Sequence, residues 1–553
     1  MELHLKAMER KTTTTRRNKE VVTKDIINSK YYLDPLELLG ERSFKEPQEV
    51  PENVQGTNIQ EFFRGKNVML TGATGFMGKV LTEKLLRSMP HMKQLYVLIR
   101  TKKGKDVNQR LDEIFEDRLY KRLKAEVPDY RKKITVVAGD CCLPNLGLTP
   151  ADHQMLVNNI NVIFHGAATV RFDEKIRLAV DINVYGAREV LAFAKQIKNL
   201  ASMVHVSTAF ANCNKLYIEE KFYSTPISYE DIMQMTKTKD DEELDKLTPE
   251  LVGDWPNTYT FTKALGEQVV KSEGAGLPIS IFRPSVVISS YREPVRGWID
   301  NVYGPTGLLV GAGTGVLHTY LGDPTHITDM VPVDLATNAL IASAYKTGNT
   351  PKVEKGEDIP IYNFVSSTQN PISWKDFIIL NQKHGMHWPT IRAVWYYSFT
   401  PIGNPFLFLI VNFLLHTLPG YILDFLAVIG GETPMLSKIY KKLGKFADTM
   451  TYFATRVWTF RNDRIQDLWA GLSEEDQQEF FFDISQMNWE YHAQANCLGL
   501  RVYLVKDDIH TLPAARKKWQ RLYYAHCALR IISGVILFKI VWMIFSFCLG
   551  LIS

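Results

Sequence analysis

The sequence contains little cysteine, which excludes two kinds of protein. Only 6 of its 553 residues are cysteine, and no two of them form a CxxC pair. Because small disulfide frameworks and zinc knuckles need more cysteine at closer spacing, we expect neither, and we predict no metal site. Cys141, Cys142 and Cys213 are interpreted as packing residues of the core. A reducing compartment fits this composition best.

The sequence also lacks an excess of charge of one sign. Its 65 lysine and arginine residues nearly balance its 60 aspartate and glutamate residues, which gives a formal net charge of +5. Proteins dedicated to nucleic acid usually carry a denser basic patch, so we expect no nucleic-acid partner. Protein partners and oligomeric state are unknown from the sequence alone.

The N-terminus lacks the apolar run of a secretory signal peptide, and residues 1–60 are predicted to form a polar leader. Apolar residues are concentrated at the other end. Residues 531–553 contain one charge, Lys539, over a length that can cross about 30 Å of hydrocarbon. Basic and aromatic residues precede this segment, as is typical of a cytoplasmic flank. We predict a single-pass transmembrane anchor in membrane lipid, with the catalytic domain in the cytosol. The endoplasmic reticulum is favoured, and the peroxisome is the alternative.

A second apolar stretch covers residues 405–431. Pro419, Gly420 and Asp424 interrupt it, so we expect an apolar hairpin whose halves are each too short to cross a membrane comfortably. Two interpretations stay open. The hairpin either packs in a soluble core, or it lies in the membrane interface or forms the wall of a channel for an apolar substrate.

A strand, a glycine-rich turn and a helix follow one another after the leader. Residues 67–70 (NVML) indicate a buried strand, and residues 79–88 have helical periodicity. The sequence TGATGFMG between them is typical of a dinucleotide-binding turn, in which glycines let the backbone approach the pyrophosphate and free helix N–H groups bind it. The candidate cofactor-binding residues of this turn are Thr71, Gly72, Thr74, Gly75, Phe76, Met77 and Gly78.

Further strands of the same parallel sheet are predicted at 95–99, 134–138, 162–165, 203–206 and 279–283. The first of these ends at Arg100, where an acidic residue would favour NAD. An arginine suits a 2′-phosphate instead, so we predict NADPH, with Lys102 as a second contact. Ligands bind at the carboxyl ends of such strands, so we expect Asp140 near the adenine and Ala167 and Ala168 near the nicotinamide ribose.

Three tyrosines are each followed by a lysine four residues later, which places both side chains on one helix face. The pairs are Tyr120/Lys124, Tyr217/Lys221 and Tyr259/Lys263. Only the third lies on a predicted helix between two strands of the sheet, so we predict Tyr259 and Lys263 as the catalytic pair. The ammonium group is expected to lower the phenol pKa from about 10 toward neutrality, making the phenol a usable acid.

Five motifs occur in the order found in the extended short-chain dehydrogenase/reductases: TGATGFMGK, HGAATVRFDE, HVSTAFAN, YTFTKALGE and IFRPSVV. GWIDN, GPTG and the segment at 480–508 more closely resemble the animal, insect-like fatty acyl-CoA reductases. The resemblance implies an α/β fold, with a Rossmann-type doubly wound parallel sheet at 61–350. It also implies a smaller, mostly helical, sterile-type domain at 351–515, before the transmembrane helix.

The resemblance further implies a reaction. It is the NADPH-dependent reduction of a long-chain fatty acyl-CoA to a primary fatty alcohol, with release of CoA, through an aldehyde. Tyr259 is then the general acid, Lys263 binds the nicotinamide ribose, and Thr208 is the hydroxyl partner, with Ser207 in reserve. Two alternatives stay open: a membrane-bound steroid or sugar-nucleotide dehydrogenase on this scaffold, and a non-catalytic NADP-binding scaffold. The insertion at 209–258 is expected to be a surface excursion or a lid.

Overall fold

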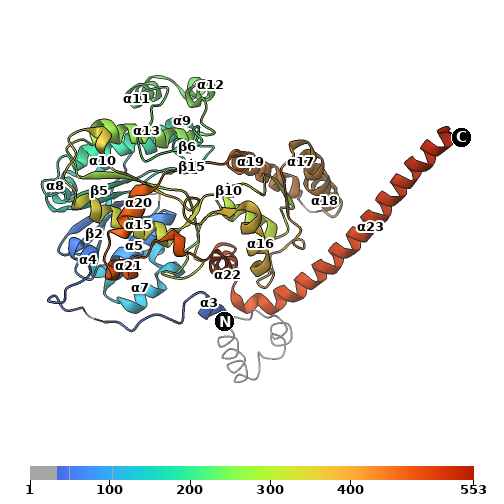
Figure 1. Cartoon of the computed structure of the whole chain (residues 1–553), viewed down its shortest axis with the longest axis horizontal. Helices are drawn as coiled ribbons and strands as arrows, with labels where there is room; N and C mark the ends of the chain where they lie inside the picture. The colour runs from blue at the N-terminus through green and yellow to red at the C-terminus, as the bar shows by residue number, and fades with distance from the viewer. Residues whose placement is uncertain (1–33, 49, 102–103, 432, 553) are drawn as a thin grey trace.

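The computed structural model describes residues 34–48, 50–101, 104–431 and 433–552 (Figure 1). Residues 1–33 of the predicted leader lie outside the described residues, as does Lys102. The described part of the leader contains the short helices α3 (Pro35–Leu38) and α4 (Asn58–Phe63). Ile59 and Phe63 of α4 are fully buried, so the end of the leader packs onto the domain that follows.

A seven-stranded parallel sheet forms the centre of the molecule, in the order β12-β7-β5-β4-β1-β2-β3. The strands are β1 (Asn67–Thr71), β2 (Gln94–Ile99), β3 (Ile134–Ala138), β4 (Val162–His165), β5 (Ser202–Val206), β7 (Ile279–Pro284) and β12 (Ile361–Phe364). The order reverses direction between β1 and β4, as in a doubly wound sheet. The predicted fold class is therefore confirmed.

Helices cover both faces of the sheet, because alternate residues of each strand point to opposite sides. Val68 and Leu70 of β1 belong to a core shared with α5 and α15, whereas Met69 belongs to the core on the α10 and α13 face. The covering helices are α5 (Phe76–Ser88), α6 (Val107–Phe115), α7 (Lys121–Glu126), α8 (Pro150–Asn159), α9 (Ile176–Val180), α10 (Gly186–Ala194), α13 (Thr258–Glu273) and α15 (Val333–Gly348).

The later part of the chain packs back onto this sheet domain. Its helices include α14 (Pro305–Gly313), α16 (Trp374–Gly385), α20 (Asp463–Ala470), α21 (Glu474–Glu479) and α22 (Trp489–Gly499). Lys84 of α5 is 3% exposed and reaches both the Glu293 carboxylate at 2.8 Å and the Glu479 carbonyl at 2.7 Å. The seventh strand, β12, also lies beyond residue 350, within the range that the sequence assigned to the second domain.

The 209–258 insertion begins with buried residues, 209–213, and continues into α11 (Tyr229–Thr238) and α12 (Asp241–Val252), at the top of Figure 1. Its first part forms β6 (Tyr217–Ile218), which pairs in parallel with β15 (Thr459–Phe460) from the later part of the chain. The insertion therefore also connects the two parts of the protein. Three further short pairs occur: β8 (Val286–Ile288) with β11 (Met330–Pro332), β9 (Thr319–Leu321) with β14 (Thr400–Ile402), and β10 (Ile327–Thr328) with β13 (Ile372–Ser373).

The apolar stretch at 405–431 is not broken into a hairpin at Pro419 and Gly420, and the expectation of two short halves is wrong. The segments α17 (Pro405–Asn412), η6 (Phe413–Thr417) and α18 (Leu418–Ile429) form one helix of 25 residues. The turn before Pro419 is π-helical, a geometry that accommodates the missing proline N–H without ending the helix. The chain reverses only after Gly431, where α19 (Leu436–Ala454) begins its return.

The chain ends in α23 (Leu512–Ile552), a single helix of 41 residues that projects from the body in Figure 1. Its large apolar side chains from Ile531 to Phe545 are all exposed. Two helical stretches within the described residues, Pro405–Ile429 and Ile509–Ser546, are long and apolar enough to cross a membrane. The predicted anchor segment therefore coincides with the second of them.

Candidate active site

A cleft of about 530 Å³ opens at the carboxyl ends of the central strands. One side is formed by the glycine turn after β1 and by residues that follow β4. The opposite side is formed by Ser207 and Thr208 after β5 and by Tyr259 and Lys263 of α13. The predicted turn and the predicted catalytic pair therefore face a common space.

The glycine turn has the close backbone packing of a dinucleotide-binding turn, because two of its glycines leave no room for a side chain. Gly72 has φ +82°, and a Cβ there would lie 2.6 Å from the Gly166 carbonyl carbon. A Cβ on Gly78 would lie 2.1 Å from the Gly72 carbonyl oxygen. Helix α5 begins at Phe76 with no side chain capping its N-terminus, so its first N–H groups remain available to a phosphate.

The other predicted turn residues lie at the same cleft. Thr74, Met77 and Ala168 line it together with Thr71. Thr71 is buried, and its hydroxyl shares a 2.8 Å hydrogen bond with His165 Nδ1 and accepts one from the Ala167 N–H at 3.2 Å. Thr71 thus fixes the backbone after β4 relative to the glycine turn.

Arg100 and Asp140 are not among the residues that line the cleft. Arg100 is exposed at the end of β2, and β2 pairs directly with β1, so it follows the strand next to the glycine turn. Asp140 follows β3, and its carboxylate accepts the Cys142 N–H at 3.0 Å. The positive charge of Arg100 acts on Cys141 and Cys142, so the ends of β2 and β3 lie close together.

Tyr259 is the second residue of α13, and Lys263 lies one turn further on. Thr208 lines the cleft beside Tyr259, and its side chain interacts with the Tyr259 phenol. Lys263 is 3% exposed, and its Nζ donates to the Val206 carbonyl oxygen at 2.6 Å. α13 and the segment after β5 therefore present a phenol, a hydroxyl and an ammonium group to one wall of the cleft.

The pKa of the Tyr259 phenol does not move in the expected direction. Burial raises this pKa to about 12, and the interaction with Thr208 opposes the rise only in part. Burial also lowers the pKa of Lys263 to about 8, against the attraction of the Glu267 carboxylate. The reason is that desolvation disfavours the charged form of both groups. The phenol therefore stays protonated, as a proton donor must.

The Ser207 hydroxyl is hydrogen-bonded to a buried ion pair formed by Glu267 and Arg283. Its Oγ donates to Glu267 Oε1 at 2.5 Å, and Glu267 accepts two hydrogen bonds from the Arg283 guanidinium at 2.8 and 2.6 Å. Glu267 and Arg283 are both at most 2% exposed. Thr208, by contrast, contacts Tyr259 directly, which favours Thr208 over Ser207 as the hydroxyl partner. Sequence reasoning did not find Glu267 or Arg283, although KALGE and IFRPSVV contain them.

Asn183 is a second residue that sequence reasoning missed. It lies in a π-helical turn, η4 (Asp181–Tyr185), beside α13. Its amide donates to the Thr262 hydroxyl at 2.9 Å and its oxygen accepts the Thr169 N–H at 3.0 Å. Asn183 thereby connects α13 to the segment after β4. A lone asparagine in an apolar helical segment gave no signal of this role.

The far wall of the cleft is aromatic and comes largely from the later part of the chain. Met450 and Phe453 of α19 line it together with Trp458. The Phe453 ring lies 5.8 Å from Phe172, and Phe172 stacks at 5.7 Å on the ring of Tyr259. The candidate acid therefore lies between the nucleotide turn and an apolar chamber.

The other two tyrosine–lysine pairs lie elsewhere. Tyr120 is buried in a 3₁₀ turn, η1 (Arg118–Tyr120), and its hydroxyl donates to the Lys79 carbonyl oxygen at 3.2 Å. Tyr217 lies in strand β6 and is 52% exposed. Neither residue lines the cleft.

The cysteines that sequence reasoning assigned to packing are poor nucleophiles. Burial raises the pKa of each of the Cys141, Cys142 and Cys213 thiols to about 12. Cys141 and Cys213 are buried in the two cores next to the cleft. Among the residues that the structure describes, no group of three His, Cys, Asp or Glu side chains is arranged to hold a metal ion.

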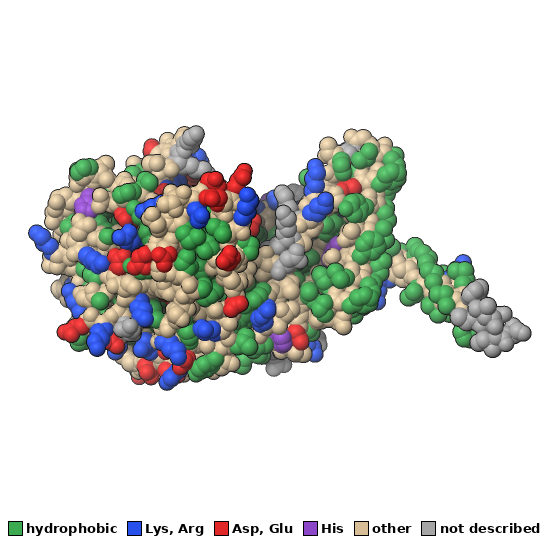
Figure 2. Space-filling model, turned by 90° about the horizontal axis from the view of Figure 1, so that it is seen from above, with side chains coloured by type: hydrophobic (Ala, Val, Ile, Leu, Met, Phe, Trp, Pro, Cys, Tyr) green, Lys and Arg blue, Asp and Glu red, His purple; other side chains and the backbone are tan. Residues whose placement is uncertain are grey.

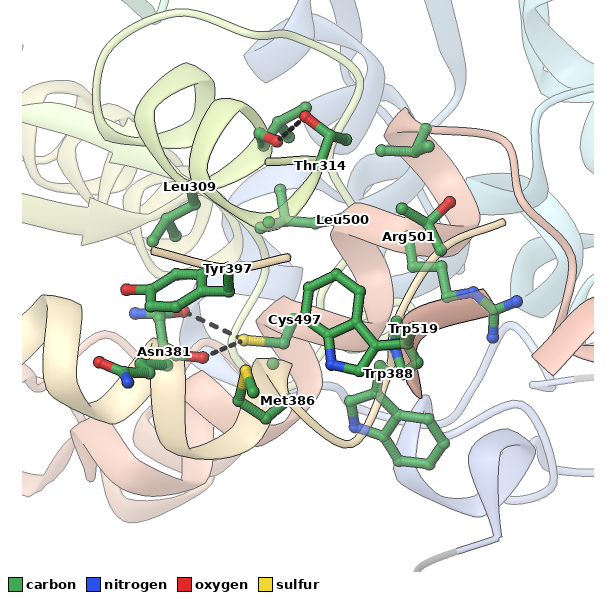
Figure 3. Close-up of a pocket in the computed structure, with 17 residues that line it drawn as sticks. Leu309, Thr314, Asn381, Met386, Trp388, Tyr397, Cys497, Leu500, Arg501 and Trp519 are labelled. Atoms are coloured by element: carbon green, nitrogen blue, oxygen red, sulfur yellow. Dashed lines mark hydrogen bonds between the residues drawn. The ribbon is translucent and has the colours of Figure 1, made fainter. Parts of the chain in front are cut away.

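A second, smaller cavity of about 80 Å³ lies between α14, α16, α22 and the base of α23 (Figure 3). Cys497 lies at its centre and donates to the Asn381 carbonyl oxygen at 3.2 Å. Burial raises the pKa of this thiol to about 12. The cavity is lined mostly by apolar side chains and has no counterpart of the tyrosine–lysine pair, so we assign the chemistry to the larger cleft.

The parallel sheet, the glycine turn and the tyrosine–lysine helix define a class of protein, the short-chain dehydrogenase/reductase type of reductase. Solved structures of reductase domains share the fold. The terminal R domain from the myxalamid PKS-NRPS biosynthetic pathway superposes with a TM-score of 0.53 at 19% identity, over 85% of this chain and 95% of that chain. The R domain of a non-ribosomal peptide synthetase from Mycobacterium tuberculosis superposes with a TM-score of 0.50 at 18% identity, over 85% of this chain and 97% of that chain.

Sequence comparison defines the family. Two male sterility protein models, an NAD-binding domain and a Sterile domain, match residues 70–340 and 415–507. Fatty acyl-CoA reductase wat of Drosophila melanogaster is 42% identical over 468 residues, covering 85% of this chain and 90% of that protein. Fatty acyl-CoA reductase 1 of Rattus norvegicus is 37% identical over 490 residues, covering 88% and 93%. The chain therefore belongs to the fatty acyl-CoA reductase family, and the resemblance seen in the sequence is confirmed.

Proposed function

We propose that this protein reduces a long-chain fatty acyl-CoA to a primary fatty alcohol with NADPH, releasing CoA and passing through an aldehyde. The observation that carries the proposal is the position of Tyr259, which lies between the glycine turn and the aromatic chamber of Phe172 and Phe453. An acyl chain fits that chamber, and its carbonyl group would then lie at the phenol.

The residues of the cleft suit each step of such a reduction. Tyr259 and Thr208 would donate hydrogen bonds to the thioester carbonyl oxygen and stabilise the negative charge that develops on it. The bound nicotinamide nucleotide would supply the hydride. Expulsion of the thiolate from the resulting hemithioacetal leaves an aldehyde, whose oxygen can occupy the same place in a second round, in which a second reduced nucleotide would supply a second hydride. Tyr259 then gives its proton to the alkoxide, and the charge of Lys263 beside it favours that transfer.

The fit of a dinucleotide is supported by the glycine turn, because the close packing at Gly72 and Gly78 leaves no room for a Cβ and lets the backbone itself line the cleft. The preference for NADPH over NADH is supported by Arg100, which follows the strand next to that turn and can pair with a 2′-phosphate. Thr71, Thr74, Phe76, Met77, Ala167 and Ala168 would hold the remainder of the nucleotide, and Asp140 its adenine.

We also propose that α23 anchors the protein in a membrane, with the catalytic domain in the cytosol. Support comes from the exposed apolar residues from Ile531 onward and from basic residues at the base of the helix. The endoplasmic reticulum is the favoured membrane, and the peroxisome is the alternative. Protease treatment of intact organelles should digest the catalytic domain, and fluorescence microscopy of the tagged chain would distinguish the two membranes.

The test of the reaction uses membranes that contain the full chain, palmitoyl-CoA or stearoyl-CoA, and either NADPH or NADH. Fatty alcohol, identified by chromatography, is expected with NADPH. Tyr259→Phe should lower turnover by about 10²- to 10⁴-fold while NADPH binding stays within about twofold, because only the acid is lost. The matched control is Tyr217→Phe, in which an exposed tyrosine of the same pattern is changed and activity is retained.

Other outcomes would redirect the proposal. Aldehyde without alcohol would keep the site but limit the chemistry to the first reduction. No product from any chain length, with NADPH still bound, would favour a steroid or sugar-nucleotide substrate or a scaffold without catalysis. Full activity in Tyr259→Phe would overturn the assignment of the acid.

A further inference from the structure

The helix from Pro405 to Ile429 has its polar side against the protein and its apolar side exposed. Asn412, His416, Gly420 and Asp424 follow one another at intervals of four residues, which places them on one face. His416, Gly420 and Asp424 are buried, and Asn412 is half-buried. This polarity is the reverse of a water-soluble surface helix, whose apolar stripe faces the core.

Each polar residue of the inward face has a specific contact. His416 Nε2 accepts the N–H of His318 at 2.9 Å, and its Nδ1 lies 2.7 Å from the Asn412 side-chain oxygen. The Asp424 carboxylate accepts the N–H groups of residues 435, 436 and 437 at 2.8–2.9 Å, and so caps the start of α19. The helix is therefore held to the protein by polar contacts rather than by its apolar side chains.

The outward face is large and continuous. Phe406, Leu409, Phe425 and Ile429 are 72%, 64%, 66% and 67% exposed, and α17 buries no residue at all. Figure 2 shows these hydrophobic side chains gathered at the end of the molecule from which α23 projects. Water-soluble proteins rarely expose an apolar patch larger than a few hundred Å² unless something covers it.

We propose that this face, the outward side of α17, η6 and α18, lies in a lipid bilayer as a second membrane contact beside α23. Two features point to lipid as the occupant. The second long apolar helix, α23, projects from the same end of the molecule, so the face and the proposed anchor lie on one side of the protein (Figure 1). Exposed lysines, Lys438 and Lys441 of α19 and Lys517 of α23, lie near these two surfaces and suit anionic headgroups.

The helix lies along the membrane surface rather than crossing it, because both of its ends return to the same body. Residues 400–402 before it pair with β9, and α19 after it runs back to the cleft. Met450 and Phe453, near the end of α19, line the chamber next to Tyr259. If the proposed function holds, α19 therefore leads from the helix in the bilayer to the cleft, on the route that an acyl chain would take.

The experiment places an environment-sensitive nitrobenzoxadiazole label on the full chain, reconstituted in phosphatidylcholine vesicles with added phosphatidylserine. The test position is Leu409→Cys, and the matched control is Lys246→Cys on the exposed side of α12. Labelling of the unsubstituted chain corrects for native cysteines, and retained NADPH binding checks the fold. Nitroxide-labelled lipid should quench the label at 409 at least about fivefold more than the label at 246, and aqueous iodide should show the opposite order.

Equal quenching of both labels by iodide would overturn the proposal. A label at 409 that is shielded from iodide and from nitroxide lipid, with shielding lost when protein is diluted in the vesicles, would assign the face to a second copy of the chain. Both readouts are independent of catalysis, so they stand even if the chain makes no alcohol.

A second pair of variants tests delivery of the substrate. Leu409→Glu combined with Ile422→Glu should raise the KM for vesicle-borne long-chain acyl-CoA by about fivefold or more, with the KM for NADPH unchanged. The control is Leu216→Glu, the same exchange at a leucine that is 59% exposed on the globular body. An unchanged KM in the double variant would separate membrane contact from substrate supply and remove the second from the proposal.

Discussion

The sheet domain and the helix from Pro405 to Ile429 obey opposite rules of burial. In the sheet, the apolar side chains of Val68, Met69 and Leu70 are at most 1% exposed. In the helix, Asp424 and His416 are buried and phenylalanine and leucine lie outside. The difference teaches that the two parts are suited to different solvents: the sheet domain to water, and the helix to lipid. Catalysis at Tyr259 would take place where these two regions meet.

The largest effect is expected from a change in the sheet domain, at the glycine turn. In Gly78→Ala the new Cβ would lie 2.1 Å from the Gly72 carbonyl oxygen, so the turn must shift. NADPH affinity should fall by more than about tenfold, and unfolding free energy by about 1–3 kcal/mol. Gly313→Ala is the control, because its Cβ would meet nothing within 4 Å. Isothermal titration measures the NADPH affinity, and thermal unfolding measures the stability. If Gly78→Ala and Gly313→Ala gave equal values, the close packing of Gly78 against Gly72 would be contradicted.

The next effect is a dependence of activity on pH. Lys263 loses its charge above its pKa of about 8, whereas the Tyr259 phenol, with a pKa of about 12, stays protonated. Thus kcat/KM should be level below about pH 7.5 and fall about tenfold per pH unit well above 8. A profile measured from about pH 6 to about pH 10, with stability checked at each point, tests this. A level profile through pH 10 would show that the charge of Lys263 is not needed.

Arg100→Ala should change cofactor preference rather than the fold, because Arg100 is exposed. Loss of a charge-assisted hydrogen bond to a 2′-phosphate should raise the KM for NADPH about tenfold and leave the KM for NADH within about twofold. Arg188→Ala, which removes an exposed charge from α10, is the control. If both nucleotides were weakened equally, the assignment of the 2′-phosphate would be wrong.

The smallest effect is expected from a change in the helix from Pro405 to Ile429. Asp424→Ala removes the acceptor of three N–H groups at the start of α19 and should lower the stability of the chain. The melting temperature of the detergent-solubilised chain should fall by a few degrees. Asp424→Asn keeps one acceptor oxygen and should cost less. If neither variant lowered the melting temperature, the buried carboxylate would not hold the helix to the protein.

Much of the fold follows from local sequence because buried parallel strands are short apolar runs between polar turns. The bounds of β3 and β4 agree with the prediction at both ends. β12 was missed because its four residues follow a long helix and carry no motif. The continuous helix at 405–429 was also missed, since Pro419 and Gly420 resemble a turn and only the π-helical turn before them keeps the helix intact.

The residues of the candidate site also divide into those that a local motif predicts and those that it does not. The glycine turn, Tyr259 and Lys263 could be found because each lies within one local motif. The Glu267–Arg283 pair and the wall from α19 could not, because their contacts depend on how distant segments pack. The direction of the Tyr259 pKa was also beyond the sequence, since it is set by burial and not by the neighbouring lysine.

The wall formed by Met450, Phe453 and Trp458 has an evolutionary consequence. These side chains shape the chamber proposed for the acyl chain, yet they belong to a segment separate from the glycine turn and from α13. Substitutions in this segment can lengthen, shorten or bend the chamber while the proton donor and the nucleotide turn stay unchanged. Descendants of one ancestral enzyme could thus diversify in the lipids they produce without ever passing through an inactive intermediate.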